Sequence, residues 1–355
     1  MRASLRLLGT RGLRIGTTAL LATLLGTVAP SSALDKALLV SWDGAERSVV
    51  YGLLRWQPAT EAPRACPSKR FEATMPTLCG DYWSCLPALC EFQVIDSWDS
   101  EGKPLTRPQH AQMLSGYSPL TTGIFRNSSA SRMPPGYTLY ERIKALAGSD
   151  VVTVHVAGRK FVSRGVTRWA ARNGAINHNL GRGGPDHRTG WRTTARLQPL
   201  LGEVAKGRFF IFIHYKEADI TAHGVGDASP AYQEAIILID KQLDQLLAGL
   251  RQAGVLEQTA VLVTTDHGFN GRFHVSRTVP SIIDTWIAAL NVELRDDMSA
   301  KLLDVTPTIL AIYGVENPNV DPPLEGRSLL VGGSAPSTTL APTTTVVPLT
   351  ATTVP

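Results

Sequence analysis

Three short motifs in this sequence carry side chains that commonly ligate metal ions. Asp43 stands alone, Asp219 and His223 are separated by three residues, and Asp266 and His267 are adjacent. Taken singly, each motif has an ordinary explanation: an aspartate after a strand most often caps a turn or helix, Asp219 and His223 could lie on one exposed helix face, and an adjacent Asp-His pair is usually incidental. Each one, however, follows a short apolar segment, so the three ends meet at one edge if these segments pair in parallel. Carboxylates and imidazoles gathered there repel one another or lose hydration unless a cation neutralises them, which predicts a metal centre.

The order of apolar and amphipathic segments predicts the fold class. Residues 37–41, 151–156, 209–214 and 260–265 are short apolar segments typical of buried strands. Between the last two, Ser229 and Pro230 begin a segment whose apolar residues recur at helical spacing until Gly254. Strands that alternate with amphipathic helices predict an α/β domain with a largely parallel central sheet and helices on both faces. Ligands of such sheets bind beyond the carboxyl ends of the strands.

Thr106, two residues before Pro108, is the candidate nucleophile. Proline is tolerated in the first turn of a helix, so the spacing predicts that Thr106 is the N-cap residue of one. Its hydroxyl would then lie where the helix dipole and free N–H groups favour an anion. A threonine that only caps the helix is the alternative. A metal centre nearby favours the nucleophile, because metal coordination activates a hydroxyl group.

The same residues, in the same order, resemble the motifs of a known family. The matching segments are Asp43-Gly44, Thr106-Arg107-Pro108-Gln109-His110, residues 113–119, Gly123-Ile124-Phe125-Arg126-Asn127, Asp219-x-x-x-His223, Asp266-His267-Gly268, residues 303–310 and Gly326-Arg327-Ser328-Leu329. They resemble the alkaline phosphatase superfamily and, within it, the type I phosphodiesterase and nucleotide pyrophosphatase branch. The resemblance covers about residues 36–331 and implies an alkaline-phosphatase-like fold. Sulfatases of this superfamily carry Cys-x-Pro-x-Arg where this chain has Thr106 and His110, so sulfatase chemistry is not expected.

The resemblance also implies two divalent metal ions. The donor set favours Zn²⁺, with Mn²⁺ or Fe²⁺ as alternatives. One ion would be held by Asp43, Asp266, His267 and Thr106, and the other by Asp219, His223 and a third histidine. His274 is the candidate third ligand, with His178 and His187 in reserve, and a purely structural His274 is the alternative. His110, His155 and His214 are interpreted as structural residues.

Asn127 and Arg107 are the expected substrate-binding residues. By the same resemblance, Asn127 donates to a non-bridging phosphoryl oxygen beside the backbone N–H of Arg107. The segment Asn127-Ser128-Ser129 is also a sequon for N-glycosylation, so a glycosylated surface asparagine is the alternative.

Residues 1–33 are predicted to form a secretory signal peptide. Four arginines lead into an apolar stretch over residues 15–28, and small residues place the cleavage after Ala33. The stretch is shorter than the ~20 apolar residues of a membrane-spanning helix, so no transmembrane segment is expected in the mature chain; an uncleaved anchor is the alternative. The formal charge of +5 falls to +1 without those four arginines, so binding to a nucleic-acid polymer is not expected. We predict a secreted or otherwise extracytoplasmic protein, in the periplasm or at the cell surface.

The catalytic domain is predicted over residues 34–331 and contains two unusual segments. Cys66, Cys79, Cys85 and Cys90 lie within residues 66–90 and favour two disulfides, with a structural zinc site as the alternative. Residues 158–192 are rich in arginine and glycine and are predicted to form an irregular basic insertion, either over an anion site or simply solvated. After the domain, residues 332–355 are rich in threonine and proline, carry no charge and are predicted to form a disordered tail.

Together these features predict a secreted, metal-dependent phosphoesterase. It would resemble a phosphodiesterase or nucleotide pyrophosphatase and hydrolyse small phosphate esters through a covalent phosphothreonine at Thr106. A phosphomonoesterase, a phosphonate hydrolase or a phosphomutase-like enzyme on the same site are alternatives. A non-catalytic binding module displayed on the tail is an alternative of a different class.

Overall fold

A central sheet of seven strands organises the chain. The computed structural model describes residues 34–54, 86–98, 102–128, 131–159, 162, 166–180, 190–296, 299–316 and 318–331. The strands are β1 (Lys36–Trp42), β2 (Gln93–Trp98), β3 (Val152–Ala157), β4 (His178–Asn179), β5 (Phe209–Tyr215), β6 (Thr259–Thr264) and β7 (Asp284–Leu290). Their order across the sheet is β2-β7-β6-β1-β5-β3-β4. Neighbours from β6 to β4 pair in parallel, whereas β7 is antiparallel to both β6 and β2.

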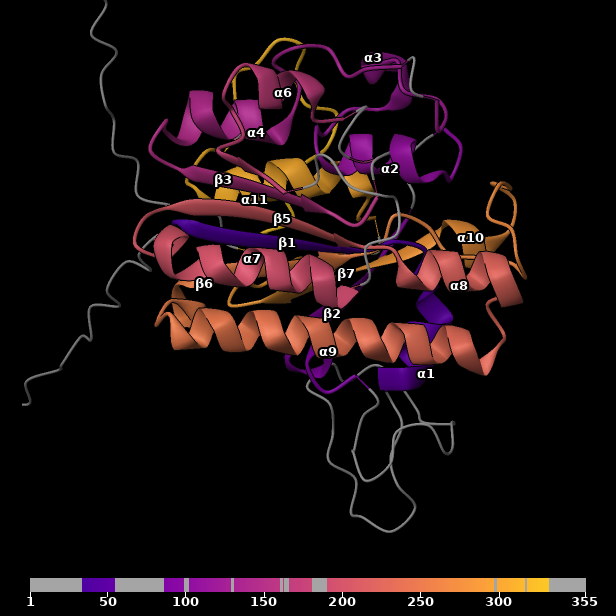
Figure 1. Ribbon diagram of the computed structural model, residues 1–355. Coiled ribbons are helices and arrows are strands. Elements are labelled where there is room, and N and C mark those ends of the chain that lie inside the picture. Colours follow the sequence, from indigo (N-terminus) through magenta and orange to yellow (C-terminus); the bar gives the residue numbers. More distant parts are fainter. Residues whose placement is uncertain are drawn as a thin grey trace, which may run out of the picture. The chain divides into compact units, whose positions relative to one another are not determined.

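Helices cover both faces of the sheet (Figure 1). One face carries α2 (Thr106–Met113), α3 (Pro119–Thr122), α4 (Leu139–Arg142), α6 (Arg168–Arg172) and α11 (Val305–Ile312). The opposite face carries α1 (Arg47–Leu54), α7 (Gly190–Val204), α8 (Glu217–Val225) and α9 (Pro230–Gln252). Short α10 (Pro280–Ile283) and the single turns η1 (Leu89–Glu91), η2 (Ile143–Ala147), η3 (Leu256–Gln258) and η4 (Leu302–Asp304) complete the described elements.

The two layers of helices enclose two separate apolar cores. In β1, Leu38 and Val40 join the core beneath α9, whereas Ala37 and Leu39 join the core beneath α2 and α11. Successive side chains of a strand point to opposite faces, so a strand buried on both faces must be apolar throughout. This requirement explains the continuous apolar segments from which the strands were predicted.

The expected α/β architecture is confirmed, and the strands predicted at β1, β3, β5 and β6 agree with the structure within one residue at either end. Helix α9 also begins as expected, because the Ser229 hydroxyl accepts a hydrogen bond from the Tyr232 N–H and Pro230 occupies the first turn. The basic segment at 158–192 is expected to be irregular, but its described residues include α6 and also β4, which pairs with β3, and they lead into α7 at Gly190.

Several predicted features lie outside the described residues. They are the signal peptide at 1–33, the tail at 332–355 and the cysteines Cys66, Cys79 and Cys85. Cys90 is buried within η1 and is disulfide-bonded. The pairing, and the presence of two disulfides in this segment, stay predictions.

Asp240 of α9 forms hydrogen bonds to the start of η1, the turn that contains Cys90. Its side chain is fully buried, and its two oxygens accept hydrogen bonds from the backbone N–H groups of Leu89 at 2.9 Å and Ala88 at 3.1 Å. Burial raises the pKa of Asp240 from 3.8 to about 7, although these two donors act in the opposite direction.

We therefore expect Asp240 to make the stability of the fold depend on pH. The pKa is higher in the folded chain than in the unfolded chain, so the folded state keeps its proton between about pH 4 and pH 7 and loses stability as the pH rises through that window. The shift corresponds to about 4 kcal/mol. In urea unfolding, the wild type should lose stability between pH 4 and pH 8 relative to Asp240→Asn. The exposed Glu234 of α9 provides the control Glu234→Gln; equal pH profiles for wild type and Asp240→Asn would contradict the assignment.

Candidate metal centre and active site

Three strand ends bring the predicted metal-ligating motifs to one edge of the sheet. In the register of the sheet, the end of β1 lies level with Tyr215 of β5 and Thr264 of β6. Asp43, Asp219 and Asp266 follow these ends directly or within four residues. The sheet therefore gathers the three carboxylates as the sequence predicts, where α/β proteins bind their ligands.

Gly44 permits the close approach of the three motifs. Its φ is +72°, and a Cβ placed on it would lie 2.9 Å from the Asp219 Cα and 2.6 Å from the ring of Phe269. Its N–H donates to Asp266 Oδ1 at 3.0 Å, and the Asp219 N–H donates to the Asp43 carbonyl at 3.0 Å. A side chain at this position would separate the motifs, so glycine is required after Asp43.

The first ligand group consists of Asp43, Asp266 and His267, all fully buried. His267 Nε2 lies 3.3 Å from Asp266 Oδ2 and 3.7 Å from Asp43 Oδ1. The other ring nitrogen, Nδ1, lies 3.1 Å from the carbonyl oxygen of Gly268, which can only accept. Nδ1 therefore carries the proton of the neutral ring, and Nε2 presents a lone pair to the two carboxylates.

The second ligand group consists of Asp219, His223 and His274. His223 Nε2 and His274 Nε2 are 3.0 Å apart, and each lies 3.5 Å from Asp219 Oδ1. His223 Nδ1 donates to the carbonyl of Arg272 at 2.9 Å, and His274 Nδ1 donates to the carbonyl of Pro104 at 2.7 Å. The backbone thus fixes both tautomers, and two lone pairs face each other and a carboxylate oxygen.

These groups fit divalent cations. Among the described residues, Asp43 Oδ1, Asp219 Oδ1, Asp266 Oδ2 and His267 Nε2 are buried without a hydrogen-bond partner. A buried acceptor left without a donor costs ~1–3 kcal/mol, so several of them aimed at one another require a cation to be stable. Oxygen and imidazole donors without a thiolate suit Zn²⁺ and related ions. Each group could therefore hold one divalent ion.

Crowding also changes the pKa values of the carboxyl groups. Burial and the neighbouring Asp43 raise the pKa of Asp219 and of Asp266. Burial acts in the same direction on Asp43, but Arg159 and His214 outweigh it and hold the pKa of Asp43 below its usual range. Burial lowers the pKa of His267. A neutral imidazole beside an ionised carboxylate is the state that metal binding needs.

Thr106 lies at the amino end of α2, but one position later than predicted. Leu105 has the extended backbone of an N-cap residue, with φ −119° and ψ 144°, so Thr106 is the first helical residue. Pro108 is still inside the first turn, where no N–H is needed for the helix. The Thr106 side chain is 1% exposed and its hydroxyl remains at the positive end of the helix.

His110 holds the first turn of α2 against β1. Its Nδ1 donates to the Thr106 carbonyl at 2.6 Å, and its Nε2 accepts from the Ser41 hydroxyl at 2.8 Å. Burial lowers the pKa of His110 to about 3, so the ring is neutral, as this pair of bonds requires. The histidine expected to be structural thus fixes the position of the candidate nucleophile.

Asn127 and Arg107 meet beside Thr106, as expected, but in a different arrangement. The Asn127 Oδ1 accepts a hydrogen bond from the Arg107 backbone N–H at 2.8 Å, so in this conformation that N–H is already bonded to the side-chain amide oxygen. The Arg107 side chain is fully buried, and burial lowers its pKa. A phosphoryl oxygen would have to displace the amide oxygen to reach this N–H.

Two residues at the site were not identified as such from the sequence. His214, interpreted as structural, donates from Nε2 to Asp43 Oδ2 at 3.0 Å. Arg159, predicted only as one of many cations in the basic segment, binds Asp219 Oδ2 through Nη2. The strand alternation contains a signal for His214, because Phe210 and Phe212 place it on the same face of β5 as α2.

The remaining histidines lie elsewhere. His178 lies in β4, which β3 and β5 separate from β1, and His187 lies outside the described residues. His155 contacts the Tyr140 hydroxyl at 2.8 Å and stacks on Phe212. Among the histidines considered as the third ligand, His274 is the one that the structure brings to Asp219 and His223.

Sequence comparison identifies the family. Residues 94–314, well over half of the chain, match the sequence profile of the family described as type I phosphodiesterase / nucleotide pyrophosphatase. The chain belongs to this family. The matched region includes Thr106, Asn127 and every candidate metal ligand except Asp43.

This phosphodiesterase-family chain is also similar to curated relatives and to several solved structures. It is 30% identical over 131 residues to a 2,3-bisphosphoglycerate-independent phosphoglycerate mutase of Wolbachia pipientis wMel, a match that spans 34% of this chain and only 23% of the mutase. Two solved structures share its fold. A putative sulfatase from Bacteroides thetaiotaomicron matches with a TM-score of 0.56 and 15% identity, over 83% of this chain and 73% of that chain. Murine ectonucleotide pyrophosphatase / phosphodiesterase 5 in complex with AMP matches with a TM-score of 0.52 and 12% identity, over 79% of this chain and 95% of that chain. The alkaline-phosphatase-like fold is thus confirmed.

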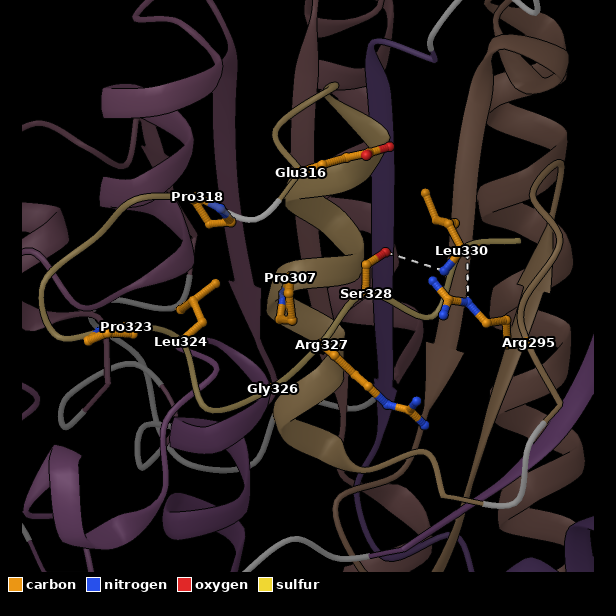
Figure 2. Close-up of a pocket in the computed structure, with 10 residues that line it drawn as sticks. All are labelled: Arg295, Pro307, Glu316, Pro318, Pro323, Leu324, Gly326, Arg327, Ser328 and Leu330. Atoms are coloured by element: carbon orange, nitrogen blue, oxygen red, sulfur yellow. Dashed lines mark hydrogen bonds between the residues drawn. The ribbon is translucent and has the colours of Figure 1, made fainter. Parts of the chain in front are cut away.

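The family member has a further cavity of about 410 Å³ that contains none of the candidate ligands (Figure 2). Its lining residues are Arg295, Pro307, Glu316, Pro318, Pro323, Leu324, Gly326, Arg327, Ser328 and Leu330. Gly326 packs directly on the turn η4, because a Cβ there would lie 2.2 Å from the Leu303 carbonyl. The motif Gly326-Arg327-Ser328-Leu329, which resembles the superfamily, thus has a packing role near the carboxyl end of the domain. None of the described helices of the chain is long and apolar enough to cross a membrane.

The ligand groups predict how metal content responds to mutation. Chain loaded with zinc and then desalted should retain close to two ions, and His274→Ala should retain close to one, because it removes one of three donors from the second group. The measurement is elemental analysis of protein after desalting. His178→Ala in β4 is the matched control and should leave both ions bound. Two ions retained by His274→Ala would exclude His274 as a ligand.

Proposed function

We propose that this chain hydrolyses small phosphate esters with the Thr106 hydroxyl as nucleophile and two divalent metal ions, Zn²⁺ foremost, as cofactors. The observation that carries the proposal is the set of buried, unpartnered acceptors of Asp43, Asp219, Asp266 and His267 beside that hydroxyl. Membership of a phosphodiesterase family supports the same reaction class.

Each ligand has an assigned place in this proposal. Asp43, Asp266, His267 and the Thr106 oxygen hold one ion, and Asp219, His223 and His274 hold the other. When bound, the two ions supply Lewis acidity, which lowers the pKa of a coordinated hydroxyl group and neutralises charge on a phosphoryl group. His214, Gly268, Arg272 and Pro104 orient the ligands through the hydrogen bonds described above.

The residues of the chain direct the reaction in two steps. Thr106 Oγ1 forms a bond to phosphorus while the ester bond to the leaving alcohol breaks, which leaves a phosphothreonine. A water oxygen then forms a bond to phosphorus while the bond between phosphorus and Thr106 Oγ1 breaks. This step returns a proton to Oγ1 and releases phosphate or a phosphate monoester. The amino end of α2 stabilises negative charge on the phosphoryl oxygens in both steps, and His110 keeps Thr106 in place.

Asn127 and Arg107 complete the binding of the phosphoryl group. A rotation of the Asn127 side chain frees the Arg107 N–H and turns the amide NH₂ toward the same oxygen. Two donors aimed at the charge that develops on one oxygen act as an oxyanion hole.

Phosphodiesters are the proposed substrate class, since the profile that matches is that of a phosphodiesterase family. Murine ectonucleotide pyrophosphatase / phosphodiesterase 5, solved with AMP, supports a small phosphate ester as the ligand. A phosphomonoesterase, a phosphonate hydrolase and a phosphomutase-like enzyme are alternatives on the same site. A binding module is disfavoured, because the nucleophile and both ligand groups are intact.

We further propose that the chain acts outside the cytoplasm. The arginine-bearing leader over residues 1–33 and the clustered cysteines support export.

Substitution of Thr106 tests the proposal. Thr106→Ala should lower kcat by several orders of magnitude, because it removes the attacking oxygen, while most of the metal is retained. Thr106→Ser keeps the oxygen and should retain part of the activity. The measurements are turnover of an aryl phosphate diester and elemental analysis of the same preparations. A Thr106→Ala enzyme with near wild-type turnover would end the covalent mechanism.

A further inference from the structure

Arg159 is the one cation of the basic segment that the described structure places among the candidate ligands. It lies two residues after β3, and its side chain is 16% exposed. Its Nη2 binds Asp219 Oδ2, and its Nη1 lies 3.5 Å from both Asp43 Oδ2 and Thr106 Oγ1. The guanidinium therefore joins the two ligand groups beside the candidate nucleophile.

Arg159 contacts one oxygen of each of two carboxylates and leaves the other oxygen available to a metal ion. The guanidinium contacts Oδ2 of Asp43 and Oδ2 of Asp219. Oδ1 of each residue lies near His267 Nε2, at 3.7 Å for Asp43 and 3.9 Å for Asp219, and has no hydrogen-bond partner among the described residues. The positive charge of Arg159 thus remains in the site when both groups bind cations, and the acids around it raise its pKa despite burial.

We propose that Arg159 binds the phosphoryl group of the substrate and extends this site to phosphate monoesters. The inference rests on the proposed function, since it assumes that phosphorus becomes bonded to Thr106 Oγ1. An oxygen on that phosphorus comes within reach of Nη1, whose present contacts, at 3.5 Å, are at the outer limit of a hydrogen bond.

The charge and the number of free oxygens differ between phosphate monoesters and diesters, and this difference decides which class Arg159 binds more strongly. A monoester presents three non-bridging oxygens and carries two negative charges near neutral pH, whereas a diester presents two such oxygens and one charge. In the proposed complex, the amino end of α2 and Asn127 bind one non-bridging phosphoryl oxygen, and the two ligand groups lie near a second one. The additional anionic oxygen of a monoester is the one that a third cation favours, because a guanidinium forms strong, charge-assisted hydrogen bonds to phosphate.

Arg159→Gln tests the inference against a matched change of charge at Arg172. Arg172 belongs to the same basic segment but is exposed on α6, so Arg172→Gln removes the same charge away from the site. Zinc-loaded wild type and both variants are assayed with 4-nitrophenyl phosphate and with its methyl diester, and their metal content is measured. Inorganic phosphate is also titrated into each protein by calorimetry.

Arg159→Gln should lower kcat/KM for the monoester about 100-fold and for the diester less than tenfold, with both ions retained and phosphate binding weakened at least tenfold. Arg159→Lys, which keeps the charge, should recover part of the monoester activity, and Arg172→Gln should match the wild type. Equal losses for both esters, or loss of metal from Arg159→Gln, would overturn the inference and leave Arg159 as a structural partner of the carboxylates.

Failure of the proposed function gives a different result. If zinc-loaded wild type turned over neither ester, the proposed hydrolysis would be wrong, and the phosphate titration would still decide the role of Arg159. Weaker phosphate binding in Arg159→Gln would then support a phosphoryl-binding role, and unchanged binding would overturn it.

Discussion

Mutual repulsion among buried carboxylates at the end of β1 is the constraint on which the site depends. Asp43 lies between the other acids: its Oδ1 faces His267, and its Oδ2 contacts His214 and Arg159. Without cations, negative charges so close together in a medium of low dielectric would destabilise the fold. Within the described residues, Arg159 supplies a cation to these carboxylates, and the remaining lone pairs face positions that suit divalent ions.

The sheet fixes the positions of these carboxylates relative to the candidate nucleophile. The level ends of β1, β5 and β6 fix the three ligand-bearing segments. The segment after β5 is helix α8, which carries Asp219 and His223 four residues apart on one helix face. The nucleophile comes from a separate element, α2, which is tied to β1 through His110 and Ser41. Ser41 and His110 are fully buried, so Thr106 is held in position before a phosphoryl group binds.

Much of this arrangement follows from local sequence patterns. Strands buried on both faces must be continuously apolar, which is why β1, β5 and β6 and the ligands after them could be predicted. The edge strand β2 and its antiparallel neighbour β7 could not, because an apolar segment does not encode its direction. The role of Arg159 could not be predicted from the sequence either. It is one of eight basic residues between 158 and 192, and only the folded chain shows that its side chain contacts Asp219. The metal and catalytic roles of the gathered residues stay predictions.

Anomalous X-ray scattering at the zinc edge, from crystals of the zinc-loaded chain, tests the central claim most directly. The account predicts two peaks, one among Asp43, Asp266 and His267 and the other among Asp219, His223 and His274, with Thr106 Oγ1 next to the first. A single peak, or peaks away from these two groups, would contradict a two-metal site built on the crowded carboxylates.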